Sequence, residues 1–267
     1  MSDKSVRPPP ALLHRVLGCV TFARNHLVLH IFALLISHLE RAAVFSDNCY
    51  LIRHGADWML WDSGYPDSVA DVAEGVVGAR NSRAFRKTTL HAQLAALSVA
   101  PAQIRYVAFS HSHGDHVGNA NLFTGATWLV RKGERDVMFS DPPSTRTEPE
   151  NFSALKNSKT TIITTPDYDV FGDGSVVIKS APGHSPDHQV LFVHLARTGP
   201  VVLSGDLYHY PEERAAHRVP KTDFNGDQTA ASRVAIEAFL KKTGAQLWIQ
   251  HDLSANTKLK KAPDYYE

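Results

Sequence analysis

Cysteine is scarce in this chain, whose 267 residues include only Cys19 and Cys49 and no CxxC pair. A zinc site built from cysteines is therefore excluded, and a framework of several disulfides is not supported. One bridge between the two residues is left open. The favoured interpretation is two buried free thiols in a reducing compartment, so we expect a cytoplasmic protein, with export not excluded.

An excess of charge of one sign is also lacking. The chain has 28 basic and 27 acidic residues and a net charge of +1. This balance provides no electrostatic footprint for nucleic acid or for an acidic membrane surface. We therefore expect a small-molecule substrate as the partner and no nucleic acid, and we leave oligomerisation open.

Long hydrophobic runs are missing as well. The most apolar stretch, residues 27–37 (LVLHIFALLIS), is too short to span a membrane, and no convincing signal-peptide cleavage site follows it. We expect no stable membrane insertion, although a membrane or export role is the alternative. Within a folded protein this stretch either packs in the core or frames the substrate pocket, because it is more apolar than a solvent-facing segment.

The chain has no internal repeat, and its length fits one large α/β unit. We divide it into an N-terminal segment of unclear packing, residues 1–47, and a folded region, residues 48–267, and expect one domain overall. Residues 68–97 are expected to be helical with interruptions near Gly75 and Gly78, and the polar residues 140–160 are expected to form an exposed loop or lid. Short apolar runs predict strands at 48–54 and 57–62, which form a hairpin around the turn at Gly55. Further strands are predicted at 106–109, 126–131, 161–164, 175–179, 189–194, 200–204 and 247–249.

Residues 227–242 form the clearest predicted helix. Ile236, Phe239 and Leu240 share one of its faces, and Gly244 suits the cap at its C-terminal end. Each half of the chain has a strand-rich block followed by a helix. This order indicates an α/β fold of two packed sheets with helices outside, although periodicity alone does not separate it from other α/β layouts.

Histidine is abundant, with fifteen residues, several of them clustered. His111, His113, Asp115 and His116 follow one another directly after a predicted strand, within the motif HSHGDH. Imidazole and carboxylate are ligands that zinc and similar divalent metals take. On a turn, the two histidines at the start of the motif can converge on one ion, and Gly114 lets the loop direct the other two ligands to a second point. Four solvated loop residues are the alternative.

Three further candidate ligands each follow a predicted strand. His184 lies in the turn APGHSP, Asp206 follows VVLSG, and His251 follows WIQ. Alone, each is typical of an ordinary loop residue. Together with the residues of HSHGDH they supply five imidazoles and two carboxylates, which suffice for two metal ions with open coordination positions.

The motifs HSHGDH and APGH, the strand that ends at Asp206 and the late QHD resemble the metallo-β-lactamase superfamily over roughly residues 48–251. The resemblance implies an αββα sandwich, in which two mixed sheets pack face to face with helices outside and a dinuclear metal site lies at one edge of the sheets. It makes residues 48–267 the catalytic domain. It assigns a first metal to His111, His113 and His184, a second metal to Asp115, His116 and His251, and the bridging position to Asp206.

Other residues gain roles only through this resemblance. Asp62 in LWDSG is similar to a strand-end aspartate that supports the ligand loop without binding metal. His188 resembles a position that buttresses the site, with an ordinary core or surface histidine as the alternative. In lactonase members a tyrosine near the bridging aspartate polarises the substrate carbonyl, and Tyr208 is the candidate here, although its spacing is not clearly the same.

The two ions are expected to be zinc. Two metals about 3.5–4 Å apart can lower the pKa of a bridging water to near neutrality, and the resulting hydroxide attacks a carbonyl or phosphoryl centre. Asp115 is expected to hold the nucleophile and then to pass a proton to the leaving group. Asp115 and Tyr208 are therefore the predicted catalytic residues.

The details of the motifs separate the branches of this superfamily. The bridging Asp206 argues against the β-lactamases proper, and His113 argues against flavodiiron proteins, which typically carry glutamate there. The remaining pattern resembles the quorum-quenching N-acyl-homoserine lactonases, which implies lactone ring opening. The alternatives are a promiscuous esterase, a phosphotriesterase or a β-lactamase-like hydrolase, and a non-catalytic metal-binding protein on the same scaffold, which is expected to have lost a ligand.

Overall fold

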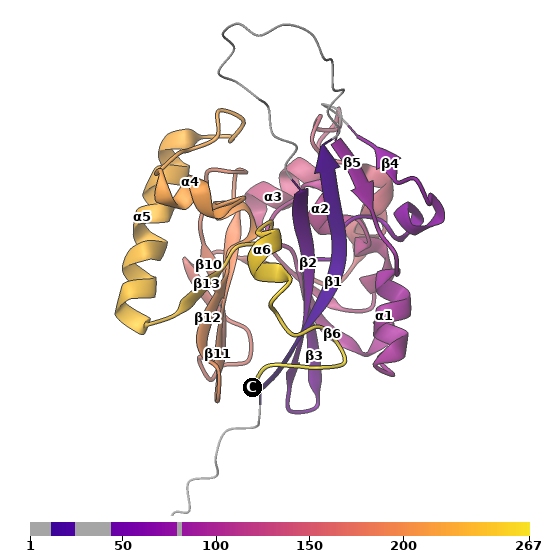
Figure 1. Cartoon of the computed structure of the whole chain (residues 1–267), viewed down its shortest axis with the longest axis horizontal. Coiled ribbons are helices and arrows are strands. Elements are labelled where there is room, and N and C mark those ends of the chain that lie inside the picture. The colour runs from indigo at the N-terminus through magenta and orange to yellow at the C-terminus, as the bar shows by residue number, and fades with distance from the viewer. Residues whose placement is uncertain (1–11, 25–43, 79–81) are drawn as a thin grey trace, which may run out of the picture.

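Two β-sheets packed face to face form the centre of the molecule, and helices cover their outer faces (Figure 1). The computed structural model describes residues 12–24, 44–78 and 82–267, with only the backbone of the first range. The expected αββα sandwich of two mixed sheets is confirmed.

The larger sheet has eight strands in the spatial order β4-β5-β1-β2-β3-β6-β7-β8. Its strands β2 and β3 form the predicted antiparallel hairpin, while β3, β6, β7 and β8 run parallel. The bounds are Leu12–Arg24 (β1), Val44–His54 (β2), Asp57–Trp61 (β3), Val76–Val77 (β4), Ser82–Phe85 (β5), Ile104–Ala108 (β6), Thr127–Arg131 (β7) and Thr160–Ile163 (β8).

The smaller sheet has five strands in the order β13-β12-β11-β10-β9. Strands β12 and β13 are parallel and the other pairs are antiparallel, so β10, β12 and β13 all end at the same edge. The bounds are Asp167–Asp169 (β9), Val176–Ser180 (β10), Gln189–Leu195 (β11), Gly199–Leu203 (β12) and Gln246–Trp248 (β13).

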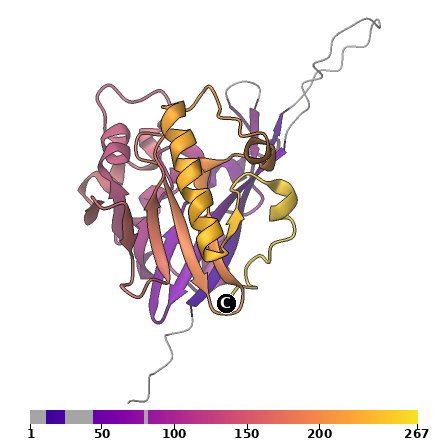
Figure 2. The same ribbon diagram turned by 90° about the vertical axis from the view of Figure 1, so that its left-hand side faces the viewer.

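Helix α5 (Gly226–Thr243) lies along the outer face of the smaller sheet (Figure 2). The side chain of Asn225 accepts a hydrogen bond from the Gln228 N–H at its start, and Gly244, with φ of 70°, ends it in the left-handed conformation, which confirms the predicted helix. No helix in the described part of the chain is long and apolar enough to cross a membrane. The other α-helices are Leu90–Ala96 (α1), Gly114–Val117 (α2), Lys132–Met138 (α3), Pro211–Ala215 (α4) and Leu253–Asn256 (α6).

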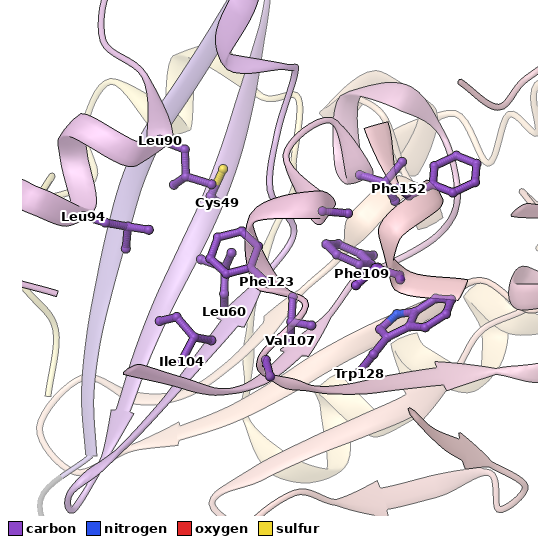
Figure 3. Packing of buried hydrophobic residues seen from close by; sticks show 14 of the residues in the cluster. Cys49, Leu60, Leu90, Leu94, Ile104, Val107, Phe109, Phe123, Trp128 and Phe152 are labelled. Atoms are coloured by element: carbon purple, nitrogen blue, oxygen red, sulfur yellow. The ribbon is translucent and has the colours of Figure 1, made fainter. Parts of the chain in front are cut away.

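Strand β2 explains why both faces of the larger sheet are buried. Successive side chains of a strand point to opposite faces. Tyr50 and Ile52 pack between the two sheets, whereas Cys49 and Leu51 pack on the outer face. On that outer face α1 contributes Leu90 and Leu94 to the same cluster (Figure 3).

The prediction of a largely helical stretch over residues 68–97 is wrong for most of its length. The described residues there form a short 3₁₀ helix (Asp67–Asp71), then β4 and β5, and among them only α1 is an α-helix. Gly75, one of the two predicted points of interruption, has φ of 75°, which is incompatible with an α-helix. The error lies in the strands, because β5 pairs with β1, a contact that local propensity does not reveal.

The exposed loop expected over residues 140–160 is also wrong in part. Two short 3₁₀ helices, Pro149–Asn151 and Ser153–Asn157, occupy its second half. Phe152 and Leu155 are completely buried in the cluster on the outer face of the larger sheet. Their spacing of three residues places both on one side of a 3₁₀ turn, so this segment covers the core.

Part of the N-terminal segment belongs to the larger sheet, because β1 pairs antiparallel with β2 and β5. The division of the chain before residue 48 stays a prediction, and residues 27–37 lie outside the described residues. Cys49 is disulfide-bonded, so the expectation of two free thiols is wrong for this residue. The cytoplasmic expectation, which was based on free thiols in a reducing compartment, is therefore not supported by Cys49.

Candidate metal centre

The seven predicted ligands converge at one edge of the two sheets. His111, His184, Asp206 and His251 each lie three or four residues past the end of a strand, namely β6, β10, β12 and β13. Short helix α2, near the top of the sheets in Figure 1, carries Asp115 and His116. The ligand atoms form two compact groups, each with all its atoms within 4.8 Å of one another: His111, His113, His184 and Asp206 in the first group, and Asp115, His116 and His251 in the second group.

Three imidazoles crowd together in the first group. His113 Nδ1 lies 2.7 Å from His111 Nε2 and 3.1 Å from His184 Nε2. His184 Nε2 lies 3.3 Å from Asp206 Oδ2. These nitrogen and oxygen atoms therefore face one shared point.

The second group contacts the other oxygen of the same aspartate. Asp206 Oδ1 lies 3.0 Å from His251 Nε2 and 3.2 Å from His116 Nε2. The two oxygens of Asp115 each lie 3.8 Å from one of these two imidazoles. Asp206 therefore lies between the two groups and offers one carboxylate oxygen to each.

The outer nitrogens of three ligand histidines are anchored. Nδ1 of His116 lies 3.0 Å from Asp62 Oδ2, and Nδ1 of His184 lies 3.0 Å from Asp223 Oδ1. Nδ1 of His251 donates to the carbonyl oxygen of Ser46 at 2.7 Å. Such partners fix the ring orientation and leave Nε2 for a metal. Asp62 also accepts a hydrogen bond from the Ser110 N–H, as a support of the ligand loop should.

His188 lies directly behind Asp206. Its Nδ1 donates to the carbonyl oxygen of Ala181 at 3.0 Å, which leaves Nε2 to accept the Asp206 backbone N–H at 2.9 Å. Gly205 makes this packing feasible, because a Cβ there would lie 2.7 Å from His188 Nε2 and 2.5 Å from Ser110 Cβ. His188 thus buttresses the site and is a member of neither ligand group.

Glu134 is a supporting residue that sequence analysis missed. It is buried in α3 and joins two ligand loops, since it accepts hydrogen bonds from the Ser112 N–H, the Ser185 hydroxyl and the Asp187 N–H. Its surroundings in the sequence, KGERD, are typical of a solvated helix, so no local signal identifies it. Sequence analysis also missed Asp223, the partner of His184, because no local sequence signal identifies it.

We expect Glu134→Ala to destabilise the protein by about 2–3 kcal/mol, because it leaves buried donors in both loops without an acceptor. Urea denaturation at equal metal loading measures this change. The matched control is Glu150→Ala, whose side chain is exposed and should change the free energy of unfolding by less than about 0.5 kcal/mol. Equal stabilities of the two variants would refute the role of Glu134.

The chemistry of the cluster fits divalent cations. His116 Nε2 and Asp206 Oδ1 are both buried, yet neither makes a hydrogen bond within the described residues. Burial and adjacent imidazoles hold the pKa of His111 well below its usual 6.5. Burial alone raises the pKa of Asp206, but His251 and His116 outweigh it and hold that pKa well below 3.8. A neutral imidazole and an ionised carboxylate are the forms that bind metal. Burial lowers the pKa of His116 and of His251, but Asp206 and Asp115 outweigh it and raise both pKa values, so a metal bound there would displace protons.

Tyr208 and His209 follow Asp206 but face different ways. The Tyr208 hydroxyl donates to Glu237 of α5 at 3.1 Å, and the guanidinium of Arg233 lies 4.3 Å above its ring. No hydrogen bond or ion pair among the described residues joins Tyr208 to the ligand cluster, so its catalytic role stays a prediction. His209 Nε2, in contrast, lies 3.3 Å from Asp206 Oδ2, and sequence analysis missed it as a site residue.

Comparison with known proteins agrees with this geometry. The family model described as "Metallo-beta-lactamase superfamily" matches residues 42–251, a span that holds every predicted ligand. The chain belongs to the metallo-beta-lactamase superfamily. Within this superfamily, it is 30% identical over 190 residues to the N-acyl homoserine lactonase AttM of Azorhizobium caulinodans, covering 66% of this chain and 68% of that protein.

Other members of the superfamily align over more of the chain. The N-acyl homoserine lactonase AiiA of Bacillus thuringiensis subsp. kurstaki is 26% identical over 225 residues, covering 81% of this chain and 85% of the relative. A crystal structure of a B. thuringiensis AiiA variant with N-decanoyl-L-homoserine at its active site superposes with a TM-score of 0.79 at 21% identity, covering 96% of this chain and 99% of that one. This superposition supports the fold.

Proposed function

We propose that this protein hydrolyses the lactone ring of N-acyl homoserine lactones. The observation that carries the proposal is the convergence of seven ligand side chains into two groups around Asp206. The substrate class follows from relatives named N-acyl homoserine lactonases. A non-catalytic protein on this scaffold is expected to have lost a ligand or Asp115, and this chain retains all of them.

We assign the first metal to His111, His113 and His184, the second to Asp115, His116 and His251, and the bridge to Asp206. Zinc suits this set of imidazole nitrogens and carboxylate oxygens. When bound, the cations would supply Lewis acidity and water ionised at neutral pH. The anchored outer nitrogens of His116, His184 and His251 keep the ligand atoms in place, so little reorganisation is needed on binding.

Asp115 is the group that moves the proton. Its side chain is 20% exposed, whereas those of His116, His251 and Asp206 are 6% exposed or less, so Asp115 can contact a bound substrate. As the carboxylate it accepts the proton of the attacking water on one oxygen. It then donates this proton to the alkoxide oxygen that leaves when the ring C–O bond breaks, which gives a carboxylic acid and an alcohol.

Removal of metal tests the proposal directly. We expect dialysis against a chelator to lower hydrolysis of N-hexanoyl homoserine lactone by roughly a hundredfold or more, because the cations activate the nucleophile. Added zinc should restore it, with the ring-opened acid detected by chromatography. A phosphotriester and a β-lactam, assayed in parallel, test the alternative hydrolases. A zinc-loaded protein that opens no lactone ring would refute the proposed function.

A further inference from the structure

Glu148 is a charged side chain beside the metal centre that the proposed mechanism does not use. Its carboxylate lies against the backbone of Gly114, the residue between the ligands His113 and Asp115. A Cβ at position 114 would lie 2.7 Å from Glu148 Oε2 and 3.1 Å from Oε1, so the carboxylate occupies the space that a side chain there would need. Glu148 therefore reaches the part of the ligand motif that carries Asp115.

The segment that carries Glu148 is fixed on both sides. Thr147 before it is 9% exposed, and Phe152 after it is completely buried. Asn151, at the end of the 3₁₀ helix Pro149–Asn151, donates from its side chain to Glu148 Oε2 at 2.8 Å. These contacts hold the carboxylate beside Gly114, so a molecule that binds in the site meets it in a defined place.

Glu148 and Asp115 are both accessible to a bound substrate. The side chain of Asp115 is 20% exposed, and Glu148 is an exposed residue. The two carboxylates are close enough to interact, because burial, Glu150 and Asp115 raise the pKa of Glu148, whereas the hydrogen bond from Asn151 lowers it. A substrate that contacts Asp115 therefore has a second carboxylate next to it.

The chemistry of the proposed substrate supplies a group that this carboxylate can recognise. In an N-acyl homoserine lactone the only N–H belongs to the amide nitrogen, which is bonded to the ring carbon next to the lactone carbonyl. When the ring ester lies at Asp115, this N–H lies beside it. An N–H that is removed from water without a new acceptor weakens binding, so an acceptor is needed at this place.

Building on the proposed function, we propose that Glu148 is a specificity-determining residue that accepts a hydrogen bond from the amide N–H of the substrate. An ionised carboxylate only accepts hydrogen bonds, and such charge-assisted bonds are stronger than neutral ones. The site thereby selects lactones with an acylamino group beside the carbonyl over lactones that lack the N–H. Gly114 makes this possible because it leaves the space that the carboxylate fills.

The test compares N-hexanoyl homoserine lactone with α-hexanoyloxy-γ-butyrolactone, which carries an ester oxygen in place of the amide N–H. Wild type should prefer the amide in kcat/KM by roughly tenfold or more, because a carboxylate facing an ester oxygen is left without a donor. In Glu148→Ala the preference should fall to about twofold or less, mainly because the amide is hydrolysed more slowly. Chromatography detects the ring-opened acids, and elemental analysis measures the metal content of each preparation.

The matched control is Glu150→Ala. Glu150 is an exposed carboxylate on the same segment, and its side chain makes no hydrogen bond or ion pair within the described residues. This variant should keep the substrate preference and the turnover of wild type. The preference is decisive because a structural defect in a variant slows both lactones by the same factor, whereas a lost hydrogen bond to the N–H slows only the amide.

Gly114→Ala is an independent variant in which Glu148 stays intact. Gly114 is not among the residues with positive φ, so alanine suits its backbone, and the flexible Glu148 side chain must move away from the new Cβ. We expect the preference to fall as in Glu148→Ala, with metal content as in wild type. The double variant should show no further fall, because both changes remove the same contact.

The other outcomes overturn the inference. A wild type that hydrolyses both lactones equally well, or a Glu148→Ala variant that slows both by the same factor, would refute recognition of the N–H and leave the lactonase function standing. An unchanged preference in Gly114→Ala would contradict the contact at position 114, and loss of metal from Glu148→Ala would make this residue a support of the metal centre. A zinc-loaded wild type that opens neither ring would refute the proposed function as well.

Discussion

Asp206→Ala is expected to remove bound metal and activity together. The two oxygens of Asp206 face different groups, Oδ1 toward His116 and His251 and Oδ2 toward His184. Every other carboxylate that pairs with a ligand histidine among the described residues contacts one group only: Asp62 and Asp115 the second, and Asp223 the first. Elemental analysis of the purified variant should show loss of most of its metal, and lactone hydrolysis should fall by roughly a hundredfold or more.

The matched control for this variant is Asp227→Ala. Asp227 is an exposed carboxylate in the first turn of α5, outside both ligand groups, so its loss should change neither metal content nor turnover. Retention of metal with normal turnover in Asp206→Ala would show that another residue bridges the two groups.

Asp115→Asn is expected to lower turnover by roughly two orders of magnitude or more, the range for lost general acid–base catalysis. The amide keeps the size of the side chain and an oxygen that can bind metal, but it cannot carry the proton from water to the leaving oxygen. Metal content should therefore fall much less than activity. Steady-state kinetics and elemental analysis on the same preparation measure both.

The leaving group distinguishes the two roles of Asp115. Esters with good leaving groups need little protonation, so Asp115→Asn should slow them less than it slows lactones. Asp115→Ala is the companion variant, because it removes the metal-binding oxygen as well and should lose metal in addition. If Asp115→Asn slowed activated and unactivated esters by the same factor, Asp115 would act as a ligand only.

The ligand set could be predicted because its chemistry is local in the sequence. HSHGDH concentrates four candidate ligands after one strand, and His184, Asp206 and His251 each follow another strand. Strands that run in the same direction end at one edge of a sheet, so the predicted strands imply the convergence that the structure has. The hairpin at Gly55 and the helix ending at Gly244 were predictable for a similar reason, since turns and caps depend on neighbouring residues.

The errors arose where contacts are distant in the sequence. Residues 82–85 form a strand because they pair with β1. Phe152 and Leu155 are buried because they pack on the apolar outer face of the larger sheet. Neither β1 nor the outer face of the larger sheet can be recognised from the residues adjacent in the sequence. The sequence analysis therefore predicted a helix in the first case and an exposed loop in the second.

By itself, the sequence determined which atoms are available to bind metal, because the ligand types and their places after strands are written in short motifs. Only the tertiary structure decided which side chains hold and complete the centre. Glu134 lies in a charged helix but is buried between two ligand loops, and Asp223 reaches His184 from the turn before α5. Between the adjacent Tyr208 and His209, the contact of one with Glu237 and of the other with Glu213 decides which faces the ligand cluster. Those choices depend on how α4 and α5 pack against the loop after β12, which no local pattern encodes.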